Sequence, residues 1–148
     1  MEKKKIRLTK QFGFESAHAL YNYDGKCCKL HGHSYKLFVT VIGYPDEDEN
    51  SPKYGMVMDF GLLKEIVNEE IINKYDHSVM LNERTKAKID TSDVLFSNVV
   101  KFKNQPTCEN MLIMFAEKIK SRLPEGVDLL NLKLYETSDS FAEWNMND

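Results

Sequence analysis

The sequence contains no long run of apolar residues and little cysteine. No stretch approaches the roughly 20 apolar residues that a membrane-spanning helix needs, and the basic start MEKKKIRLTKQF is not followed by the apolar segment of a signal peptide. The 3 cysteines form an odd set in which the adjacent Cys27 and Cys28 are poorly placed to bridge each other, so the sequence does not indicate a disulfide framework. We therefore expect a soluble protein of the reducing cytoplasm, with no membrane partner.

An excess of charge of one sign is also missing. The chain has 20 lysines and arginines against 23 aspartates and glutamates, for a net charge of -3, and the lysines are not gathered into a stripe. Because neutralising nucleic-acid phosphates requires such a basic surface, we expect no nucleic-acid partner. The chain has no linker-like segment and no internal repeat, and its 148 residues suit one core. We expect a single domain, residues 1–148.

Two segments alternate between apolar and polar residues, which is the pattern of half-buried strands. The even positions of 6–20 are mainly apolar, and the odd positions of 33–42 carry a similar series. Between them, 21–29 reads YNYDGKCCK, and its Asn, Asp and Gly tolerate the backbone angles of turns. The sequence therefore predicts a long antiparallel hairpin.

Two other segments carry apolar residues at the helical period of 3.6. The first, at about 60–73, follows Asp59 as its N-cap. The second begins at Thr107, another N-cap residue, and ends before Pro124 and Gly126. Both segments are predicted to be amphipathic helices.

The C-terminal part predicts two more strands, because the even positions of 130–136 share one side and FAEW can form a short strand. The predicted order is strand, strand, helix, helix, strand, strand, which is an α+β fold with four strands. Segment 82–105 has no clear period. A strand pair, a short helix and a folded flap all fit its apolar residues.

Three histidines are candidates for one metal site. His31 and His33 are two residues apart on a predicted strand and point to one side, and His18 lies on the apolar side of the preceding strand. A lone histidine is more often a hydrogen-bonded core residue, but three buried imidazoles without a shared partner would each cost roughly 1 to 3 kcal/mol. Three imidazoles leave one position open, which is typical of catalytic zinc.

Cys27 lies four residues before His31, in the predicted turn. Its thiolate can approach a metal-bound substrate and act as a proton-abstracting base, although a small apolar filler is the commoner role of a cysteine. Because Cys28 is adjacent, spacing does not decide which thiol faces the metal. A thiolate that closes a structural four-ligand zinc site is an open alternative.

Two acidic positions complete the candidate site. Asp76 precedes His77, and a carboxylate beside an imidazole can set its tautomer for acid-base catalysis, although a histidine at the end of a helix gives the same pattern. Glu136 continues the apolar side of 130–136, where its carboxylate can bind a planar edge with two N–H donors. A salt bridge with a lysine is the alternative role of Glu136.

Read in order, FESAHAL, CCKLHGHSY, GMVMDF, KYDH, PTCEN and YETS span almost the whole chain. This succession resembles the 6-pyruvoyl/6-carboxy-tetrahydropterin synthase family. The position of a cysteine four residues before the HGH motif resembles the pattern of the 6-carboxy-tetrahydropterin synthase branch, which serves queuosine biosynthesis. Two features depart from the family pattern: Cys28 stands where we expect glycine or a polar residue, and segment 82–105 is longer than in compact members.

The resemblance implies a role for each candidate residue. It places Zn²⁺ on three histidines, the catalytic base and its acid-base companions on a cysteine and an Asp-His pair, the pterin anchor on a glutamate, and the pterin near the start of the second helix. In that order the residues are His18, His31 and His33; Cys27, Asp76 and His77; Glu136; and Thr107 and Glu109.

The resemblance also implies a tunnelling fold, in which a four-stranded antiparallel sheet with two helices on one face joins other copies into a β-barrel. It implies a homohexamer, a dimer of trimers, with active sites assembled across subunits. Zinc-dependent conversion of 7,8-dihydroneopterin triphosphate to 6-carboxy-5,6,7,8-tetrahydropterin, with release of acetaldehyde and triphosphate, is the implied reaction. The alternatives are formation of 6-pyruvoyl-tetrahydropterin without carbon-carbon cleavage, a nonenzymatic zinc-stabilised oligomer, and a zinc hydrolase.

Overall fold

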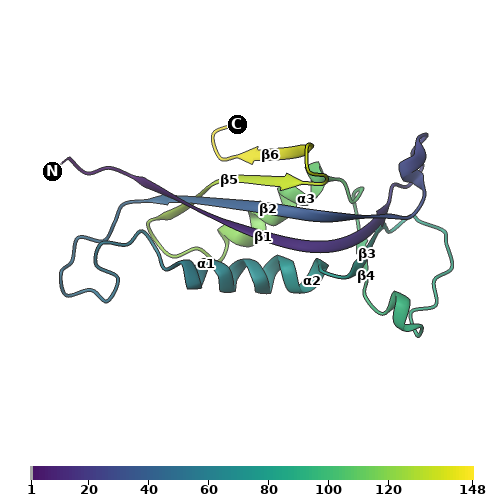
Figure 1. Ribbon diagram of the computed structural model, residues 1–148, viewed down its shortest axis with the longest axis horizontal. Helices are drawn as coiled ribbons and strands as arrows, with labels where there is room; N and C mark the ends of the chain where they lie inside the picture. The colour runs from purple at the N-terminus through teal and green to yellow at the C-terminus, as the bar shows by residue number, and fades with distance from the viewer. Residues whose placement is uncertain (1) are drawn as a thin grey trace.

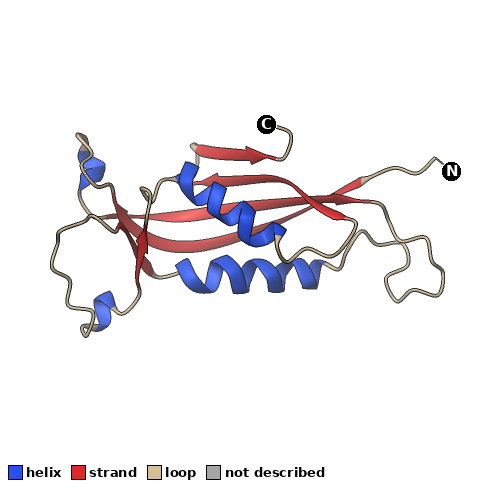
Figure 2. Ribbon diagram, turned by 180° about the vertical axis from the view of Figure 1, so that it is seen from behind, coloured by secondary structure: helices blue, strands red, loops and turns tan. Residues whose placement is uncertain are grey.

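The computed structural model describes residues 2–148. Its six-stranded sheet has the strand order β4-β3-β1-β2-β5-β6, and its helices cover one face of that sheet (Figure 1, Figure 2). The strands are β1 (Ile6–Ala19), β2 (His31–Gly43), β3 (Ser78–Asn82), β4 (Val99–Phe102), β5 (Val127–Tyr135) and β6 (Phe141–Asn145). The helical elements are α1 (Phe60–Val67), the π-helical turn η2 (Asn68–Ile72), α2 (Asn73–Tyr75) and α3 (Cys108–Lys120).

β1 and β2 form the predicted long antiparallel hairpin, with His18 directly opposite His31 at its closed end. Even positions of β1 and odd positions of β2 therefore share one face, and this face is buried under the helices. The connecting turn contains Asn22 at φ 58°, a left-handed conformation that asparagine tolerates, and the 3-10 turn η1 (Lys26–Cys28).

Both predicted helices are confirmed. The Asp59 carboxylate accepts a hydrogen bond from the Gly61 N–H at 2.7 Å, as expected of an N-cap. From there α1 continues through η2 into α2, so the first helical segment ends at residue 75 instead of 73. Thr107 precedes α3, and its hydroxyl accepts from the Asn110 N–H.

The core lies between the helices and the central strands. Its most deeply buried large side chains come from the hairpin, both helical segments, β3 and β5, and they are Tyr35, Phe115, Leu37, Leu63, Ile66, Ile71, Met80, Met111, Leu112, Ile119, Leu132 and Leu134. This apolar contact fixes the sheet against the helices, since burial of such side chains is the main favourable term in folding.

The prediction of four strands was wrong, because β3 and β4 lie between the two helical segments and extend the sheet to six. β3 pairs in parallel with β1, and β4 pairs in parallel with β3. Both are short, and tertiary pairing beside β1, more than apolar alternation, holds them in the sheet. Segment 82–105 thus contains a loop, the 3-10 turn Val94–Phe96 and β4.

The two C-terminal strands are confirmed, with one change of register. A bulge opposite the Thr40/Val41 step makes Leu129 the partner of Val41, whereas Leu132 pairs with Val39. Leu130 therefore does not continue the regular alternation of the even positions. β6 covers Phe141–Asn145 and includes the predicted FAEW strand.

The other face of the hairpin is polar and carries no helix (Figure 2). Thr9 and Thr40 lie side by side on it, with their hydroxyls 2.7 Å apart, and Glu15 accepts a hydrogen bond from Ser34 at 2.6 Å. Within residues 2–148, no helix has the length and apolar character needed to cross a membrane.

Two isoleucines of α3 test how the helix is held. Ile119 is 0% exposed and Ile113 is 56% exposed. Ile119→Ala is expected to lower the free energy of unfolding by about 2 to 5 kcal/mol, because it leaves a cavity in the core. Ile113→Ala, the matched control, should change it by no more than about 0.5 kcal/mol. Urea denaturation measures both, and similar losses for the two variants would contradict this packing.

Candidate metal centre

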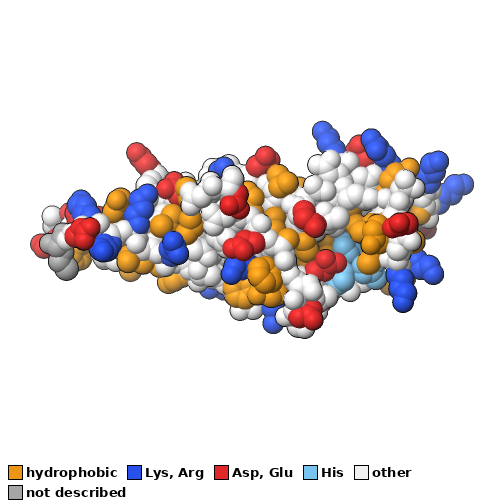
Figure 3. All heavy atoms as spheres, turned by 90° about the horizontal axis from the view of Figure 1, so that it is seen from above, with side chains coloured by type: hydrophobic (Ala, Val, Ile, Leu, Met, Phe, Trp, Pro, Cys, Tyr) orange, Lys and Arg blue, Asp and Glu red, His pale blue; other side chains and the backbone are white. Residues whose placement is uncertain are grey.

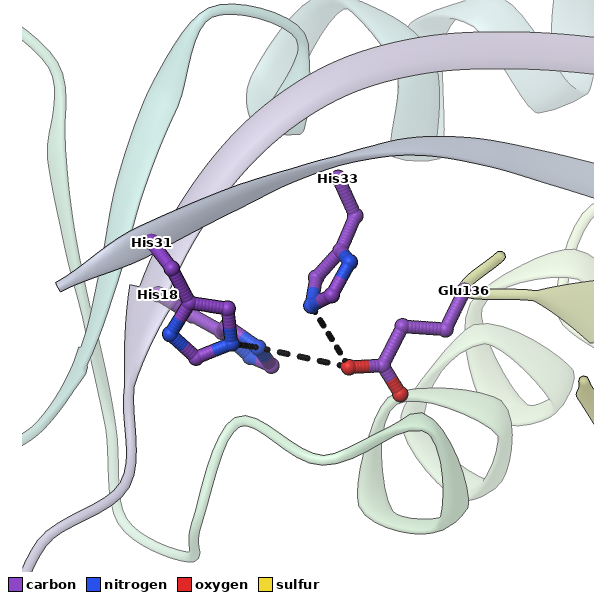
Figure 4. A group of neighbouring side chains, drawn as sticks. All are labelled: His18, His31, His33 and Glu136. Carbon is purple, nitrogen blue, oxygen red and sulfur yellow. Dashed lines mark hydrogen bonds and ion pairs between the residues drawn. The ribbon is translucent and has the colours of Figure 1, made fainter. Parts of the chain in front are cut away.

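The three histidines converge at the closed end of the hairpin (Figure 4). His18 comes from β1, His31 and His33 come from β2, and Glu136 follows directly after β5. One donor atom from each of these four side chains lies within 4.8 Å of the other three. In the space-filling view, histidine atoms (pale blue) reach the surface near one end of the molecule, beside a carboxylate (Figure 3). His31, His33 and Glu136 are half-buried, so part of the group is exposed to solvent.

Backbone carbonyls fix the tautomers of two histidines. His18 Nδ1 is 2.7 Å from the Pro106 carbonyl oxygen, and His31 Nδ1 is 2.7 Å from that of Lys29. A carbonyl can only accept, so each Nδ1 carries its proton and each neutral ring presents a lone pair at Nε2. The two Nε2 atoms are 3.0 Å apart. Two facing lone pairs need a cation between them.

His33 and Glu136 add to this conflict. Glu136 Oε1 lies 2.7 Å from His33 Nε2 and 3.5 Å from His18 Nε2. Among residues 2–148, His33 Nε2 is nevertheless a buried nitrogen without a hydrogen-bond partner. Burial lowers the pKa of both His18 and His33, although the neighbouring Glu136 raises each. The neutral rings thus favoured are the forms that bind metals. The four residues fit a metal ion, and three imidazoles with a carboxylate form a ligand set that suits zinc.

Cys108 lies on the other side of the Glu136 carboxylate. Its thiol donates to Glu136 Oε2 at 3.5 Å. Burial, and then the charge of Glu136, raises the pKa of the Cys108 thiol well above its usual value, so the thiol keeps its proton. This contact also brings the start of α3, with the predicted Thr107 and Glu109, next to Glu136.

The two turn cysteines differ in exposure. Cys27 is half-buried in η1 and its carbonyl accepts from the Leu20 N–H at 2.9 Å, whereas Cys28 is exposed. Both thiols are free. Among residues 2–148, the convergent donor group contains Glu136 and neither of these cysteines.

Asp76 and His77 are hydrogen-bonded to the backbone of Glu15 in β1. Asp76 Oδ1 accepts from the Glu15 N–H at 2.9 Å and lies 3.1 Å from His77 Nδ1. The Glu15 N–H lowers the pKa of the Asp76 carboxyl, and His77 contributes in the same direction. The His77 side chain is 80% exposed, and no hydrogen bond or ion pair within residues 2–148 joins it to the three other histidines. Within residues 2–148 of one chain, no hydrogen bond or ion pair thus links the pair to the convergent donor group.

Several site contacts lie beyond the sequence prediction. The carbonyls of Pro106 and Lys29 and the Cys108 thiol carry no recognisable motif, and the structure shows Glu136 among the histidines. The parity of 130–136 places Glu136 on the correct face. Only the pairing of β5 with β2 brings it beside His33.

Comparison with known proteins identifies the class. The family model described as "6-pyruvoyl tetrahydropterin synthase" matches residues 7–147. The chain therefore belongs to this family.

Individual relatives agree with that assignment. The chain is 32% identical over 143 residues to the 6-carboxy-5,6,7,8-tetrahydropterin synthase of Rickettsia bellii, with 93% of this chain and 99% of the relative covered. It is 33% identical over 142 residues to the Haemophilus influenzae protein of that name, covering 94% and 98%. The solved 6-pyruvoyl tetrahydropterin synthase of Caenorhabditis elegans shares the fold, with a TM-score of 0.67, 24% identity, and 98% and 99% of the chains covered.

Removal of one imidazole tests the metal centre. Adding Zn²⁺ to metal-free wild-type protein is expected to raise its unfolding temperature, because an ion at 100 times its Kd stabilises the folded state by about 2.7 kcal/mol. His31→Ala should lose this increase and its bound metal. His77→Ala, the control outside the donor group, should keep both. Thermal denaturation with metal analysis decides, and equal increases in the two variants would contradict the assignment.

Proposed function

We propose that this protein is a zinc-dependent 6-carboxy-5,6,7,8-tetrahydropterin synthase of the cytoplasm, working as a single domain over residues 1–148. In this proposal it converts 7,8-dihydroneopterin triphosphate to 6-carboxy-5,6,7,8-tetrahydropterin and releases acetaldehyde and triphosphate, a carbon-oxygen and carbon-carbon lyase reaction of queuosine biosynthesis. The observation that carries the proposal is the convergence of His18, His31 and His33. A half-buried cysteine, Cys27, lies four residues before His31 in the sequence.

The candidate residues divide the work. His18, His31 and His33 hold the ion, and zinc, when bound there, polarises substrate oxygens as a Lewis acid. Cys27 is the base that removes a proton from the substrate side chain. Its half-buried position, compared with the exposed Cys28, favours it for contact with a molecule seated at the histidines.

The pterin ring is assigned to the neighbourhood of Glu136. A carboxylate accepts two hydrogen bonds from the planar N–H edge of the ring. The first turn of α3 lies on the same side, since Cys108 contacts Glu136, and this supports the assignment of Thr107 and Glu109 to the border of the ring.

Asp76 and His77 are assigned to a site on a neighbouring chain. His77 is exposed, and Asp76 is held to the Glu15 backbone so that it can orient the imidazole. In the proposed homohexamer, a dimer of trimers whose sheets join into a barrel, this pair exchanges protons with the hydroxyls of a substrate bound by another copy. Such joining also covers the open edges of the sheet.

A second candidate function is 6-pyruvoyl-tetrahydropterin synthesis, which eliminates triphosphate without carbon-carbon cleavage. The family model and the Caenorhabditis elegans structure carry that name. Product mass separates the two reactions, and acetaldehyde is released only in the first. If zinc-loaded protein releases neither triphosphate nor acetaldehyde from 7,8-dihydroneopterin triphosphate, both assignments are wrong.

Replacement of Cys27 tests its role as a base. Cys27→Ala is expected to keep its zinc and fold while losing at least about 100-fold in turnover, the usual contribution of a proton-transfer group. Cys28→Ala is the matched control and should stay near wild-type activity. Mass spectrometry of the product and metal analysis give both quantities. Loss of zinc from Cys27→Ala would favour the nonenzymatic zinc-stabilised oligomer.

Mixing two inactive variants tests the shared site. Cys27→Ala and His77→Ala are each expected to be inactive alone, but subunits mixed under exchange conditions should regain part of the wild-type turnover. In mixed oligomers some sites combine an intact Cys27 with an intact His77 from different chains. Mixtures that stay inactive after exchange, with mixed oligomers demonstrated by native mass spectrometry, would show that one chain supplies both residues.

A further inference from the structure

We propose that Glu136 occupies two positions: in the substrate-free protein its carboxylate is the fourth ligand of the metal, and it leaves the metal when a pterin binds. The first position is argued from the geometry of the cluster. The second rests on the proposed function, because it takes the pterin as the ligand that Glu136 then binds.

Three of the distances between donor atoms are close to those of a tetrahedral ligand shell, and all four donor atoms lie within 4.8 Å of one another. Four ligands arranged tetrahedrally at about 2.0 to 2.1 Å from zinc lie about 3.3 Å from one another. In the structure the His18 and His31 nitrogens are 3.0 Å apart, and Glu136 Oε1 is 2.7 Å from His33 and 3.5 Å from His18. The position that three imidazoles alone would leave open is therefore filled by Glu136 (Figure 4).

The carboxylate of Glu136 suits a cation held by neutral imidazoles better than a water molecule does, because it brings a negative charge. Glu136 Oε1 faces His33 Nε2, which has no hydrogen-bond partner. In the tautomer that binds a metal through Nε2, the ring proton is on Nδ1 and both facing atoms are acceptors, so a cation held in common accounts for their 2.7 Å separation. Neutral imidazoles supply no charge, so one carboxylate reduces the net charge of a divalent centre from two to one.

Glu136 is also free to move. It lies one residue beyond the end of β5, and its side chain is 32% exposed. Within residues 2–148, its carboxylate forms no ion pair with a lysine or arginine. Its other oxygen, Oε2, accepts only from the Cys108 thiol at 3.5 Å, and a thiol is a weak donor. A ligand with two N–H donors can therefore compete for the carboxylate.

The two positions would couple ring recognition to metal access. While Glu136 is on the metal, anions and water have no free coordination position. When a pterin edge takes the carboxylate, the same movement opens the position that the substrate oxygens need. Glu136 is then a group that touches metal in one state and substrate in the other.

Azide binding to Co²⁺-substituted protein tests the resting position, because azide needs a vacant or weakly held coordination site and alters the visible spectrum of Co²⁺. Glu136→Gln and Glu136→Ala are expected to bind azide at least about tenfold more tightly than wild type, and their azide-free spectra should differ from that of wild type. Glu117→Gln, an exposed carboxylate on α3, is the matched control and should behave as wild type. Equal azide affinities and identical spectra in wild type and both Glu136 variants would overturn the proposal.

A pterin without side-chain hydroxyls, 6-methylpterin, tests the displacement. In wild type it should change the Co²⁺ spectrum towards that of Glu136→Gln, and in the variant it should leave the spectrum unchanged. If 6-methylpterin leaves the wild-type spectrum unchanged, displacement is wrong. The turnover assay with 7,8-dihydroneopterin triphosphate is independent of both spectra, so an inactive protein that passes the azide test refutes the proposed function alone. Failure of wild type to bind any Co²⁺ or Zn²⁺ would refute both.

Discussion

The register between β1 and β2 is the constraint on which the candidate site depends. It places His18 directly opposite His31 and puts His33 on the same face, two residues along β2. A shift of one residue in this register would turn the histidines of one strand to the other face of the sheet. The apolar residues of that strand, which hold the helices, would turn with them. The same alternation therefore specifies both the core and the donor group. Stability and the convergence of the donor group are therefore linked through one pairing of strands.

Residues in loops also position the side chains of the candidate site. The carbonyls of Pro106 and Lys29 set the tautomers of His18 and His31, and neither residue is part of a regular element. The segment before α3 is held in place by Gln105, whose side chain accepts from the Tyr21 N–H at 2.9 Å and donates to the Tyr21 carbonyl. These two hydrogen bonds join the segment before α3 to the turn that follows β1. Such partners of metal-binding histidines typically orient the rings and tune their affinity.

The donor group lies on the helix-covered face, beside Tyr35, which is 1% exposed. The opposite face and the Asp76-His77 pair are left accessible, with Glu15 linking the pair to β1. A second chain placed against these surfaces would receive the acid-base groups of this pair at its own site without disturbing the core. This division of labour is the basis of the shared active site proposed above.

Much of this protein was determined by its sequence. The alternation of 6–20 and 33–42 and the caps Asp59 and Thr107 led to the hairpin and both helices, because those signals are local. The spacing of His31 and His33 predicted a shared face, since alternate residues of a strand point the same way.

Tertiary structure alone decided the rest. β3 is a strand because it pairs with β1, and β4 is a strand because it pairs with β3; no apolar alternation predicted β3, and segment 82–105 had no clear period that predicted β4. Glu136 lies among the histidines because β5 pairs with β2, whereas its sequence position showed only which face it occupies. Hydrogen bonds from side chains to distant carbonyls, and the neighbours of a strand, depend on contacts between residues far apart in the chain. Local patterns specify the elements and their faces, but the order of strands in space fixes which donors meet.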